Sequence, residues 1–423
     1  MISDFEKIQK LIKNKNFKES LVSINIIPNH MENFDLIGLK GFTYLKLQEF
    51  KKSYDCYSTA IGINSDSFMC FNLRATASFE LGNFIDSISD FKKALHINDK
   101  LYEIYENIGK CYSNLGENIK AIKYYELALD HSPNNKKLIE TISEKLTEPN
   151  IPLDKKDKIS KINLAIKNLK YEYSLDTKIN DDEIRKIFNE AEYLIDKNFS
   201  GLNFVQTQIF RRNRLNLNCD RHFLVFGTFK IIPEFCFSCI KVTIDVNNVI
   251  ELIKLFLVFD NISLPNNNLR KCMIDLRKDS KTNYKGFVYC RSIEEAEIVK
   301  KNINQIIKIK ISDKLSANIK RGCTAFNKIY PGYENTKTNA VNYNSDWKKS
   351  EDIIDEKFPK FKLINKNQES IRGINFYDIM IIKNWLFFAK LTNDDSYKKI
   401  SQKITFNSNL KKIIEQNKLD IEN

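Results

Sequence analysis

Residues 102–135, YEIYENIGKCYSNLGENIKAIKYYELALDHSPNN, hold small residues, aromatic residues and a Leu-Gly pair at spacings that decide the fold of the N-terminal third. The small and aromatic residues recur twice upstream with a period of 34 residues, and the Leu-Gly pair recurs once. The columns of equivalent residues are Gly41, Ala75 and Gly109; Ser53, Ser87 and Ala121; Tyr57, Phe91 and Tyr125; and Ala60, Ala94 and Ala128. A fixed period of this length predicts an array of stacked supersecondary units.

Each column has a physical reason. Small side chains allow two helices of one unit to approach closely, and the large aromatic side chains fill the space between units. The pairs Leu81-Gly82 and Leu115-Gly116 predict a turn between the two helices, because glycine adopts turn conformations that other residues avoid. Pro133 ends the third unit.

These columns resemble the tetratricopeptide repeat family over three full repeats, Phe34–Ser67, Phe68–Leu101 and Tyr102–Asn135. A degenerate repeat precedes them, and the amphipathic stretch from Lys137 is expected to form a capping helix. The resemblance implies an α-solenoid of antiparallel helix pairs over residues 1–148, with a groove that binds a peptide or a partner helix. It implies no catalysis.

The resemblance also places the groove on particular residues. They are Phe42, Asn72, Thr76, Phe79, Glu106 and Lys110. One subclass of the family holds C-terminal carboxylates with a clamp of Lys, Asn and Arg. Those positions here are Gly38, Phe42, Leu73, Glu103 and Asn107, so a clamp for an acidic tail is not expected. The alternative function of the array is to support the domain that follows it.

The charge of the chain is unevenly distributed. The net charge is +13, of which residues 1–150 contribute −1 and residues 151–423 contribute +14. Such a surplus suggests an acidic or phosphate-bearing partner, although the Lys-rich and Asn-rich composition also accounts for part of it. Nine cysteines in a chain without an apparent export signal predict reduced thiols and a cytoplasmic location. No apolar stretch is long enough to predict a membrane span.

Three further segments follow the repeats. Residues 149–200 are expected to form a linker and helices, and residues 201–330 a basic α+β domain. The order of predicted elements in that domain is β-α-β-β-α-β, which is similar to the ferredoxin-like arrangement. Its first strand is expected within FCFSCIKVTIDV, residues 235–246. Residues 331–423 are expected to be a polar loop followed by a helical segment, with a long helix near 374–389.

The predicted strands assign residues to the sheet face opposite the helices. They are Phe237, Cys239, Lys241, Asp275, Arg277, Phe287, Tyr289 and Lys320. The stretch Lys285-Gly286-Phe287-Val288-Tyr289 partly resembles the third-strand motif of RNA-recognition domains, whose aromatic residues stack bases. This resemblance implies a single-stranded nucleic-acid partner. The alternative is that the C-terminal segment covers this face.

Two short pairs, Cys219 with His222 and Cys236 with Cys239, have the spacing of a structural zinc site. A regular strand would however place residues three apart on opposite faces, which opposes convergence of Cys236 and Cys239 on one ion. The alternative is that these thiols fill the core and that the histidine makes a local hydrogen bond.

Most arginines of this Lys-rich chain lie between Arg211 and Arg321. The cluster Arg211, Arg212, Arg214 and Arg221 is a candidate anion site, because a guanidinium binds phosphate with two parallel donors. The alternative is that these arginines form a solvated face. Arg277, on the predicted sheet face, is a further candidate for binding an anion or nucleic acid. Sequence motifs for phosphate loops, metalloproteases and serine hydrolases are missing. The sequence therefore favours an adaptor. A nucleic-acid-binding protein is the runner-up, and an enzyme acting on an anionic substrate is the least supported hypothesis.

Overall fold

A computed structural model describes residues 4–98, 102–147, 157–169, 171, 177–199, 201–211, 217–276, 282–336, 340–362 and 372–419. The chain divides into two compact units, which are described separately. Unit 1 comprises residues 1–135, 218–225 and 349–365. Unit 2 comprises residues 136–217, 226–348 and 366–423.

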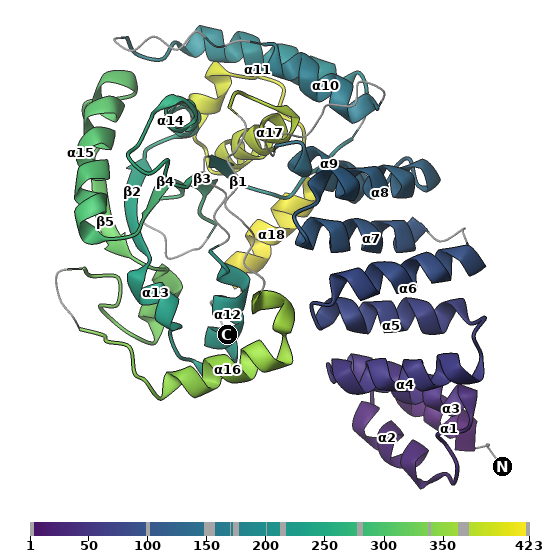
Figure 1. Ribbon diagram of the computed structural model, residues 1–423. Helices are drawn as coiled ribbons and strands as arrows, with labels where there is room; N and C mark the ends of the chain where they lie inside the picture. The colour runs from purple at the N-terminus through teal and green to yellow at the C-terminus, as the bar shows by residue number, and fades with distance from the viewer. Residues whose placement is uncertain are drawn as a thin grey trace. The chain divides into compact units, whose positions relative to one another are not determined.

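Unit 1 is built mainly from helix pairs that follow one another along the chain (Figure 1). The helices are α1 (Asp4–Lys13), α2 (Phe17–Ile26), α3 (Phe34–Lys46), α4 (Phe50–Ile63), α5 (Phe68–Glu80), α6 (Phe84–Ile97), α7 (Tyr102–Asn114) and α8 (Asn118–His131). The last three pairs coincide with the three predicted repeats. The pair α1 and α2 corresponds to the degenerate first repeat.

The turn inside each pair depends on one residue with a left-handed backbone. Gln48, Gly82 and Gly116 have φ of 61°, 80° and 74°, and they recur with the period of the repeat. In each turn a backbone N–H bonds back to the end of the first helix, as from Asn83 to the carbonyl oxygen of Ser78 at 2.9 Å. This bond is typical of a helix end that is closed by a left-handed residue.

The small residues of the repeats lie under aromatic rings. A Cβ atom at Gly41 would lie 3.0 Å from the ring of Tyr57, and one at Gly109 would lie 2.6 Å from the ring of Tyr125. Buried Ser53 donates a hydrogen bond to the carbonyl oxygen of Gly41 at 2.9 Å. The columns predicted from the sequence therefore correspond to direct contacts between paired helices.

Two segments from the second half of the sequence also belong to unit 1. They are the start of α12 (Cys219–Phe229) and the segment formed by α16 (Trp347–Lys357) and the 3-10 helix η2 (Pro359–Lys362). The sequence predicted a polar loop here, and for α16 that prediction was wrong. The helix buries only Ile354 and Glu351. So narrow a buried stripe gives no clear helical periodicity in a sequence rich in charge.

Unit 2 is organised around a five-stranded antiparallel sheet with the strand order β1-β3-β4-β2-β5 (Figure 1). Its strands are β1 (Gln208–Arg211), β2 (Ile240–Val246), β3 (Arg270–Ile274), β4 (Tyr284–Cys290) and β5 (Ala317–Arg321). From β2 onward the elements follow the predicted order. Strand β1 was not predicted, because four residues beside an arginine-rich stretch carry little pattern.

Helices α14 (Val249–Asn261) and α15 (Ile293–Lys310) pack on one face of this sheet. Gly286 in β4 allows the close approach of α14, since a Cβ atom there would lie 2.5 Å from Leu255. The side chains of Asn248 and Ser292 cap the two helices by accepting the backbone N–H groups of Glu251 and Glu295.

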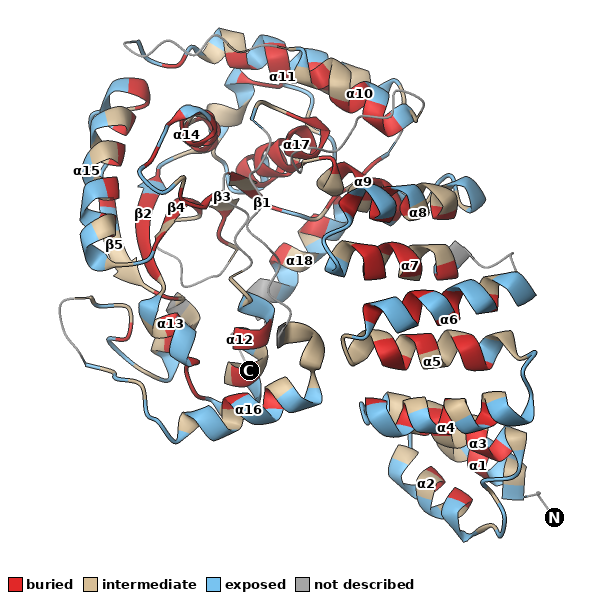
Figure 2. Ribbon diagram, viewed as in Figure 1, coloured by how far each residue is buried: buried red, intermediate tan, exposed pale blue. Residues whose placement is uncertain are grey.

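Helix α17 (Phe376–Leu391) is buried on nearly all sides (Figure 2). It corresponds to the helix predicted near 374–389. A capping box of Asn375 and Asp378 begins it, and the indole N–H of Trp385 donates to the carbonyl oxygen of Thr207 at 2.8 Å. The remaining elements of unit 2 are α9 (Lys136–Lys145), α10 (Lys158–Lys167), α11 (Asp181–Asp196), α13 (Glu234–Ser238), η1 (Thr324–Lys328), η3 (Asp395–Lys399) and α18 (Ser408–Leu419).

The two units cut across the predicted domain boundaries at 148, 200 and 330. Helix α9, predicted as a cap of the repeats, is assigned to unit 2, and residues 226–348 and 366–423 form one body. Among the described residues, no helix combines the length and the apolar character that a membrane crossing requires.

Candidate functional site

The predicted groove residues lie on the first helices of the three repeats, and all six are half-buried. They are Phe42 on α3; Asn72, Thr76 and Phe79 on α5; and Glu106 and Lys110 on α7. The spacing of three or four residues along α5 and α7 places these side chains on one face of each helix. Phe42, Thr76 and Lys110 thus occupy equivalent positions on consecutive repeats, and so do Asn72 and Glu106.

Local interactions orient several of these side chains. The hydroxyl of Thr76 donates to the carbonyl oxygen of Asn72 at 2.9 Å. The Lys110 ammonium lies 2.8 Å from the Glu106 carboxylate and 3.1 Å from the amide oxygen of Asn107. The Lys46 ammonium lies over the Phe42 ring at 5.0 Å. The surface therefore combines aromatic and polar groups, and it suits a partner segment of mixed character.

The segment of unit 1 that follows α16 contacts one of the predicted groove residues. The Lys360 ammonium lies 2.6 Å from the Glu80 carboxylate at the end of α5, and 5.7 Å from the centroid of the Phe79 ring. The side chains of Lys360 and Glu80 are 23% and 24% exposed, so solvent reaches this ion pair. One end of the predicted groove is therefore occupied by the chain itself.

Aromatic contacts accompany this ion pair. Phe358 meets the buried ring of Phe50, the first residue of α4, edge to face at a centroid distance of 6.1 Å. Phe361 packs against Phe358 at 6.1 Å, and its carbonyl oxygen accepts a hydrogen bond from the Asn218 side chain at 2.8 Å. The segment Phe358–Phe361 thus places a lysine between two phenylalanines against the turns of the repeats.

Buried ion pairs fix α16 to the start of α12. The guanidinium of Arg221 binds the Asp355 carboxylate through two nitrogens, at 2.6 and 2.9 Å, and that of Glu351 at 2.9 Å. These hydrogen bonds raise the pKa of Arg221, against the effect of burial. The sequence predicted Arg221 as an anion-binding residue. The structure instead directs its donors to carboxylates of the same unit.

Sequence reasoning missed Glu80 and the segment Phe358–Phe361. A weak signal was present, since two phenylalanines alternate with lysines around Pro359 in an otherwise acidic stretch. The contact joins residues that are far apart in sequence, and no local pattern reveals such a pairing.

In unit 2 the strand register collects lysines and aromatic residues on the sheet face away from α14 and α15. Lys241 is opposite Tyr289 and Lys320, and Lys271 is opposite Phe287. We call this surface the basic face; its residues are Lys241, Lys271, Lys285, Lys320, Phe287 and Tyr289. The ammonium groups of Lys241 and Lys271 lie over the Phe287 ring at 5.2 and 5.3 Å.

Several groups of the basic face are buried, since Lys241, Lys285 and Phe287 are each less than a tenth exposed. Burial lowers the pKa of Lys320, and the nearby ammonium of Lys241 lowers it further. Lys285 forms an ion pair with Asp275 at 2.8 Å, which neutralises part of the charge. Phe237 and Cys239, which were predicted on this face, are not in a strand: Phe237 lies in α13, and Cys239 caps that helix before β2 begins. The short helix forms because Pro233 starts a turn where an extended strand was expected.

Arg211 was also predicted to bind an anion, but its guanidinium is buried inside unit 2. It pairs with Asp260 at 2.5 Å and with Asp378 at 2.5 Å, and it stacks over the Phe256 ring at 4.6 Å. The role of Arg211 is thus to neutralise two buried carboxylates that join β1, α14 and α17. Arg212, Arg214 and Arg277, the other predicted anion ligands, lie outside the described residues.

The four predicted zinc ligands are not parts of a single loop. Cys219 and His222 lie in the first turn of α12 in unit 1, whereas Cys236 and Cys239 belong to unit 2. Over the described residues, no three side chains of His, Cys, Asp or Glu come together as metal ligands would. Cys236 instead packs in an apolar cluster with Ile232, Phe326 and Tyr333. Burial and the neighbouring Arg221 lower the pKa of His222 to about 4.

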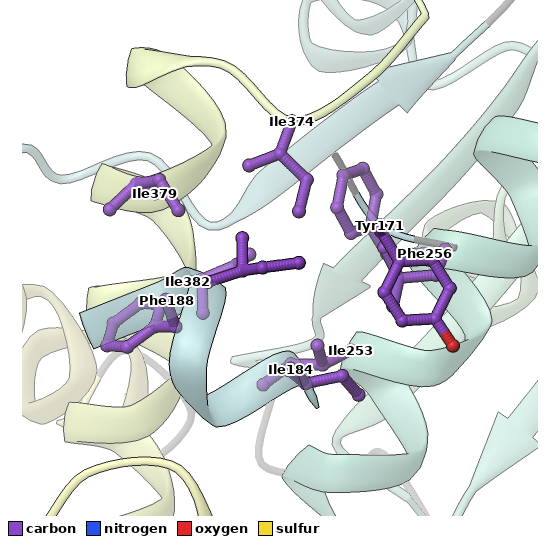
Figure 3. Close-up of a pocket in the computed structure, with 10 residues that line it drawn as sticks. Tyr171, Ile184, Phe188, Ile253, Phe256, Ile374, Ile379 and Ile382 are labelled. Carbon is purple, nitrogen blue, oxygen red and sulfur yellow. The ribbon is translucent and has the colours of Figure 1, made fainter. Parts of the chain in front are cut away.

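A small apolar pocket lies between α11, α14 and α17 in unit 2 (Figure 3). Its walls are formed by Tyr171, Ile184, Ile187, Phe188, Ile253, Phe256, Leu257, Ile374, Ile379 and Ile382. Apart from the tyrosine, these are hydrocarbon side chains, so the lining supplies no convergent polar groups that would orient a substrate. The pocket therefore indicates neither a substrate nor a reaction.

Comparison with known proteins identifies the repeats. The family described as tetratricopeptide repeat matches residues 102–135, the third helix pair of unit 1. The third helix pair is a tetratricopeptide repeat, and the pairs α3–α4 and α5–α6 carry the same columns of residues. This agrees with the columns of small and aromatic residues and with the turns that recur at the period of the repeat.

Curated relatives are similar to the chain over limited lengths. "Hsp70-Hsp90 organizing protein 2" of Arabidopsis thaliana is 26% identical over 156 residues, which cover 36% of this chain and 26% of that protein. "Small glutamine-rich tetratricopeptide repeat-containing protein 2" of Mycosarcoma maydis is 25% identical over 99 residues, 23% of this chain and 28% of that protein. The chain thus matches only about a quarter of the length of these relatives.

Among solved structures, the chain is similar to the "Arabidopsis OM64 TPR domain", with 26% identity, 28% of this chain and 97% of that chain covered, and a TM-score of 0.26. A second is "First TPR of Spaghetti (RPAP3) bound to HSP90 peptide SRMEEVD", with 24% identity, 27% and 91% covered, and a TM-score of 0.26. TM-scores this low carry no argument about the fold or the function of this chain.

Proposed function

We propose that this protein is an adaptor in which the tetratricopeptide repeats hold a segment of another protein while unit 2 carries a second interaction. The observation that supports this most directly is the row of half-buried groove residues on α3, α5 and α7. Related proteins that contain such repeats include an Hsp70-Hsp90 organizing protein. We also propose a cytoplasmic location, because the nine cysteines are expected to be reduced thiols.

The proposal excludes an acidic C-terminal tail as the partner. A clamp for terminal carboxylates uses basic and amide side chains. The equivalent positions Leu73 and Glu103 are apolar and acidic, and only Asn107 offers an amide. A site of this composition would repel the carboxylates of such a tail or leave them without donors. The groove instead suits a segment with apolar and polar side chains of mixed charge.

The expected result of adding charge and bulk to the groove is a selective loss of peptide binding. Peptides would be selected by phage display on the full-length protein, and the most enriched peptide would be labelled with fluorescein. We expect Thr76→Arg to weaken its binding about tenfold or more, since a long cation fills the centre of the groove. Fluorescence anisotropy would measure the dissociation constant.

Thr59→Arg is a matched control. Thr59 lies exposed on the second helix α4, and its hydroxyl bonds the carbonyl oxygen four residues earlier at 3.1 Å, as that of Thr76 does. We expect this control to leave peptide affinity unchanged. Equal binding by Thr76→Arg and wild type, or the failure to enrich any peptide, would remove the groove from the proposal.

A second candidate function is the binding of single-stranded nucleic acid on the basic face. What favours it is the placement of Phe287 and Tyr289 among four lysines by the strand register. Tyr289 is the more accessible ring, and a base reaches the buried Phe287 ring only if the lysines over it move aside. We also propose that β2 to β5 with α14 and α15 form the ferredoxin-like arrangement, which the strand order supports. Proteins with such faces stack bases on aromatic rings and bind the phosphates with lysines.

This second function predicts a loss of affinity that depends on the rings. A labelled oligouridine is the probe, and Phe287→Leu combined with Tyr289→Ala is expected to weaken its binding about tenfold or more, because each stacked base contributes ~1–3 kcal/mol. The leucine retains apolar bulk at a buried position. Lys308→Gln on the exposed side of α15 is the control. An affinity that responds equally to the control, or that is unchanged in the double variant, would contradict base stacking.

A further inference from the structure

The repeats already hold a peptide segment that comes from the chain itself. We define the tip as Phe358–Phe361 and the tip site as Phe50, Phe79 and Glu80. We propose that the tip site recognises a lysine flanked by aromatic residues, and that a partner segment with this chemistry replaces the tip. This inference rests on the proposed function, because it specifies the kind of partner that the repeats bind.

The chemistry of the tip site is opposite in sign to that of a carboxylate clamp. The Glu80 carboxylate accepts the Lys360 ammonium at 2.6 Å, and the Phe79 ring lies 5.7 Å from the same ammonium. A carboxylate beside an aromatic ring selects a cation over a neutral or acidic side chain. Phe50 supplies the apolar contact for the preceding aromatic residue.

The shape of the ligand is fixed as well. Pro359 separates Phe358 from Lys360, and its ring restricts the backbone so that little conformational freedom is lost on binding. The two phenylalanines remain in contact with each other at 6.1 Å, and Lys360 lies 5.6 Å from the centroid of Phe361. The tip is therefore a preorganised aromatic-Pro-Lys-aromatic motif, and we expect a partner to present the same order of groups.

The tip can leave its site without loss of the helix that carries it. The buried pairs of Arg221 with Asp355 and Glu351 hold α16 to the start of α12 independently of the tip. The Lys360–Glu80 pair is about a quarter exposed, and an ion pair of that kind contributes at most about fivefold to binding. Because the tip is tethered, it competes with a partner for the tip site at an effective concentration of about millimolar. A partner segment must therefore bind the site more strongly than the tip does in order to replace it.

The test measures binding of a synthetic copy of the tip to the full-length protein. The probe is the fluorescein-labelled peptide DEKFPKFK, which corresponds to Asp355–Lys362. In the Lys360→Glu variant the tip is repelled by Glu80 and its site is vacated. We therefore expect this variant to bind the probe at least about tenfold more tightly than the wild-type chain, in which the tip competes.

Three controls separate recognition from general effects of charge. Lys357→Glu makes the same change of charge at an exposed position just before the tip. Its ammonium lies over the Phe358 ring at 5.7 Å, within the same segment, whereas Lys360 pairs with Glu80 on α5, so we expect this control to bind the probe about as wild type does. The double variant Glu80→Lys with Lys360→Glu restores a pair of opposite sign, so the tip site is closed and also repels the probe. A peptide with both phenylalanines replaced by alanine is expected to lose binding. Circular dichroism verifies that each variant keeps its helices.

The inference is overturned if the Lys360→Glu chain binds the probe no better than wild type, or if Lys357→Glu gains as much affinity. It is also overturned if the double variant binds as tightly as Lys360→Glu, since Glu80 would then not be the acceptor. None of these results would contradict peptide binding that depends on Thr76. The adaptor function is therefore tested separately, by the Thr76→Arg experiment.

Discussion

Replacing Arg211 with methionine is expected to lower the free energy of unfolding of the full-length protein by about 3–5 kcal/mol, measured by urea denaturation. Methionine retains most of the side-chain volume and removes the charge. The carboxylates of Asp260 and Asp378 would then remain buried without a cation, and their guanidinium hydrogen bonds at 2.5 Å would be lost. An unpaired buried charge is among the largest single-residue penalties in a protein.

The location of this arginine explains why the effect is large. Its side chain is 3% exposed, and it connects β1 to α14 and to the first turn of α17. Asp260 also accepts the backbone N–H of Gly373 at 2.9 Å, and Asp378 completes the capping box of α17. Removing the cation therefore affects the strand and both helices at once.

The pH dependence of this variant has a definite sign. Burial raises the pKa of Asp378 above its ordinary value even though Arg211 acts to lower it. Without Arg211 the folded state binds a proton at a higher pH than the unfolded state does. Its stability then increases as the pH falls through that raised pKa. The penalty of Arg211→Met should accordingly become smaller in mild acid.

Arg185→Met provides the comparison for this experiment. Arg185 pairs with Asp182 on the surface of α11, where the two side chains are 51% and 75% exposed. We expect its loss to change the free energy of unfolding by less than about 1 kcal/mol. If the two variants unfold at the same urea concentration, the buried ion cluster does not stabilise unit 2 as described.

The second large effect is expected from Gly109→Ala, which should destabilise the repeats by about 1–3 kcal/mol. The added Cβ atom would lie 2.6 Å from the Tyr125 ring, so that α7 and α8 must move apart. The same substitution at Gly62, where nothing lies within 4 Å of the new atom, should stabilise α4 by about 0.5–1 kcal/mol. Urea denaturation followed by far-ultraviolet circular dichroism measures both changes.

The middle repeat suggests a rescue for this variant. There the same two positions hold Ala75 and Phe91, and both are buried. The double variant Gly109→Ala with Tyr125→Phe copies this pair. The clashing ring carbons remain, but a ring without a hydroxyl group can shift without breaking a polar contact, so we expect part of the lost stability to return. A double variant as unstable as Gly109→Ala alone would show that the small residue and the ring are not matched to each other across the repeats.

The N-terminal repeats could be predicted from the sequence because their determinants are local. The contact of Gly41 with Tyr57 and the left-handed turn at Gly82 each involve neighbouring helices, so the residues concerned recur at a fixed spacing. The order of strands and helices from β2 to β5 was accessible for a similar reason, since alternation and capping residues act within single elements. The α13 helix was missed because Pro233 overrides the alternating pattern that follows it.

Only the tertiary structure decided what the individual charges do. Arg211, Arg221 and Lys360 have similar sequence surroundings, rich in charge and poor in pattern. Their partners Asp378, Asp355 and Glu80 lie more than a hundred residues away along the chain. Local residue spacing determined that the repeats form. Which charges are neutralised inside the protein, and that the tip contacts Phe79 and Glu80 on α5, depend on long-range packing that local spacing does not encode.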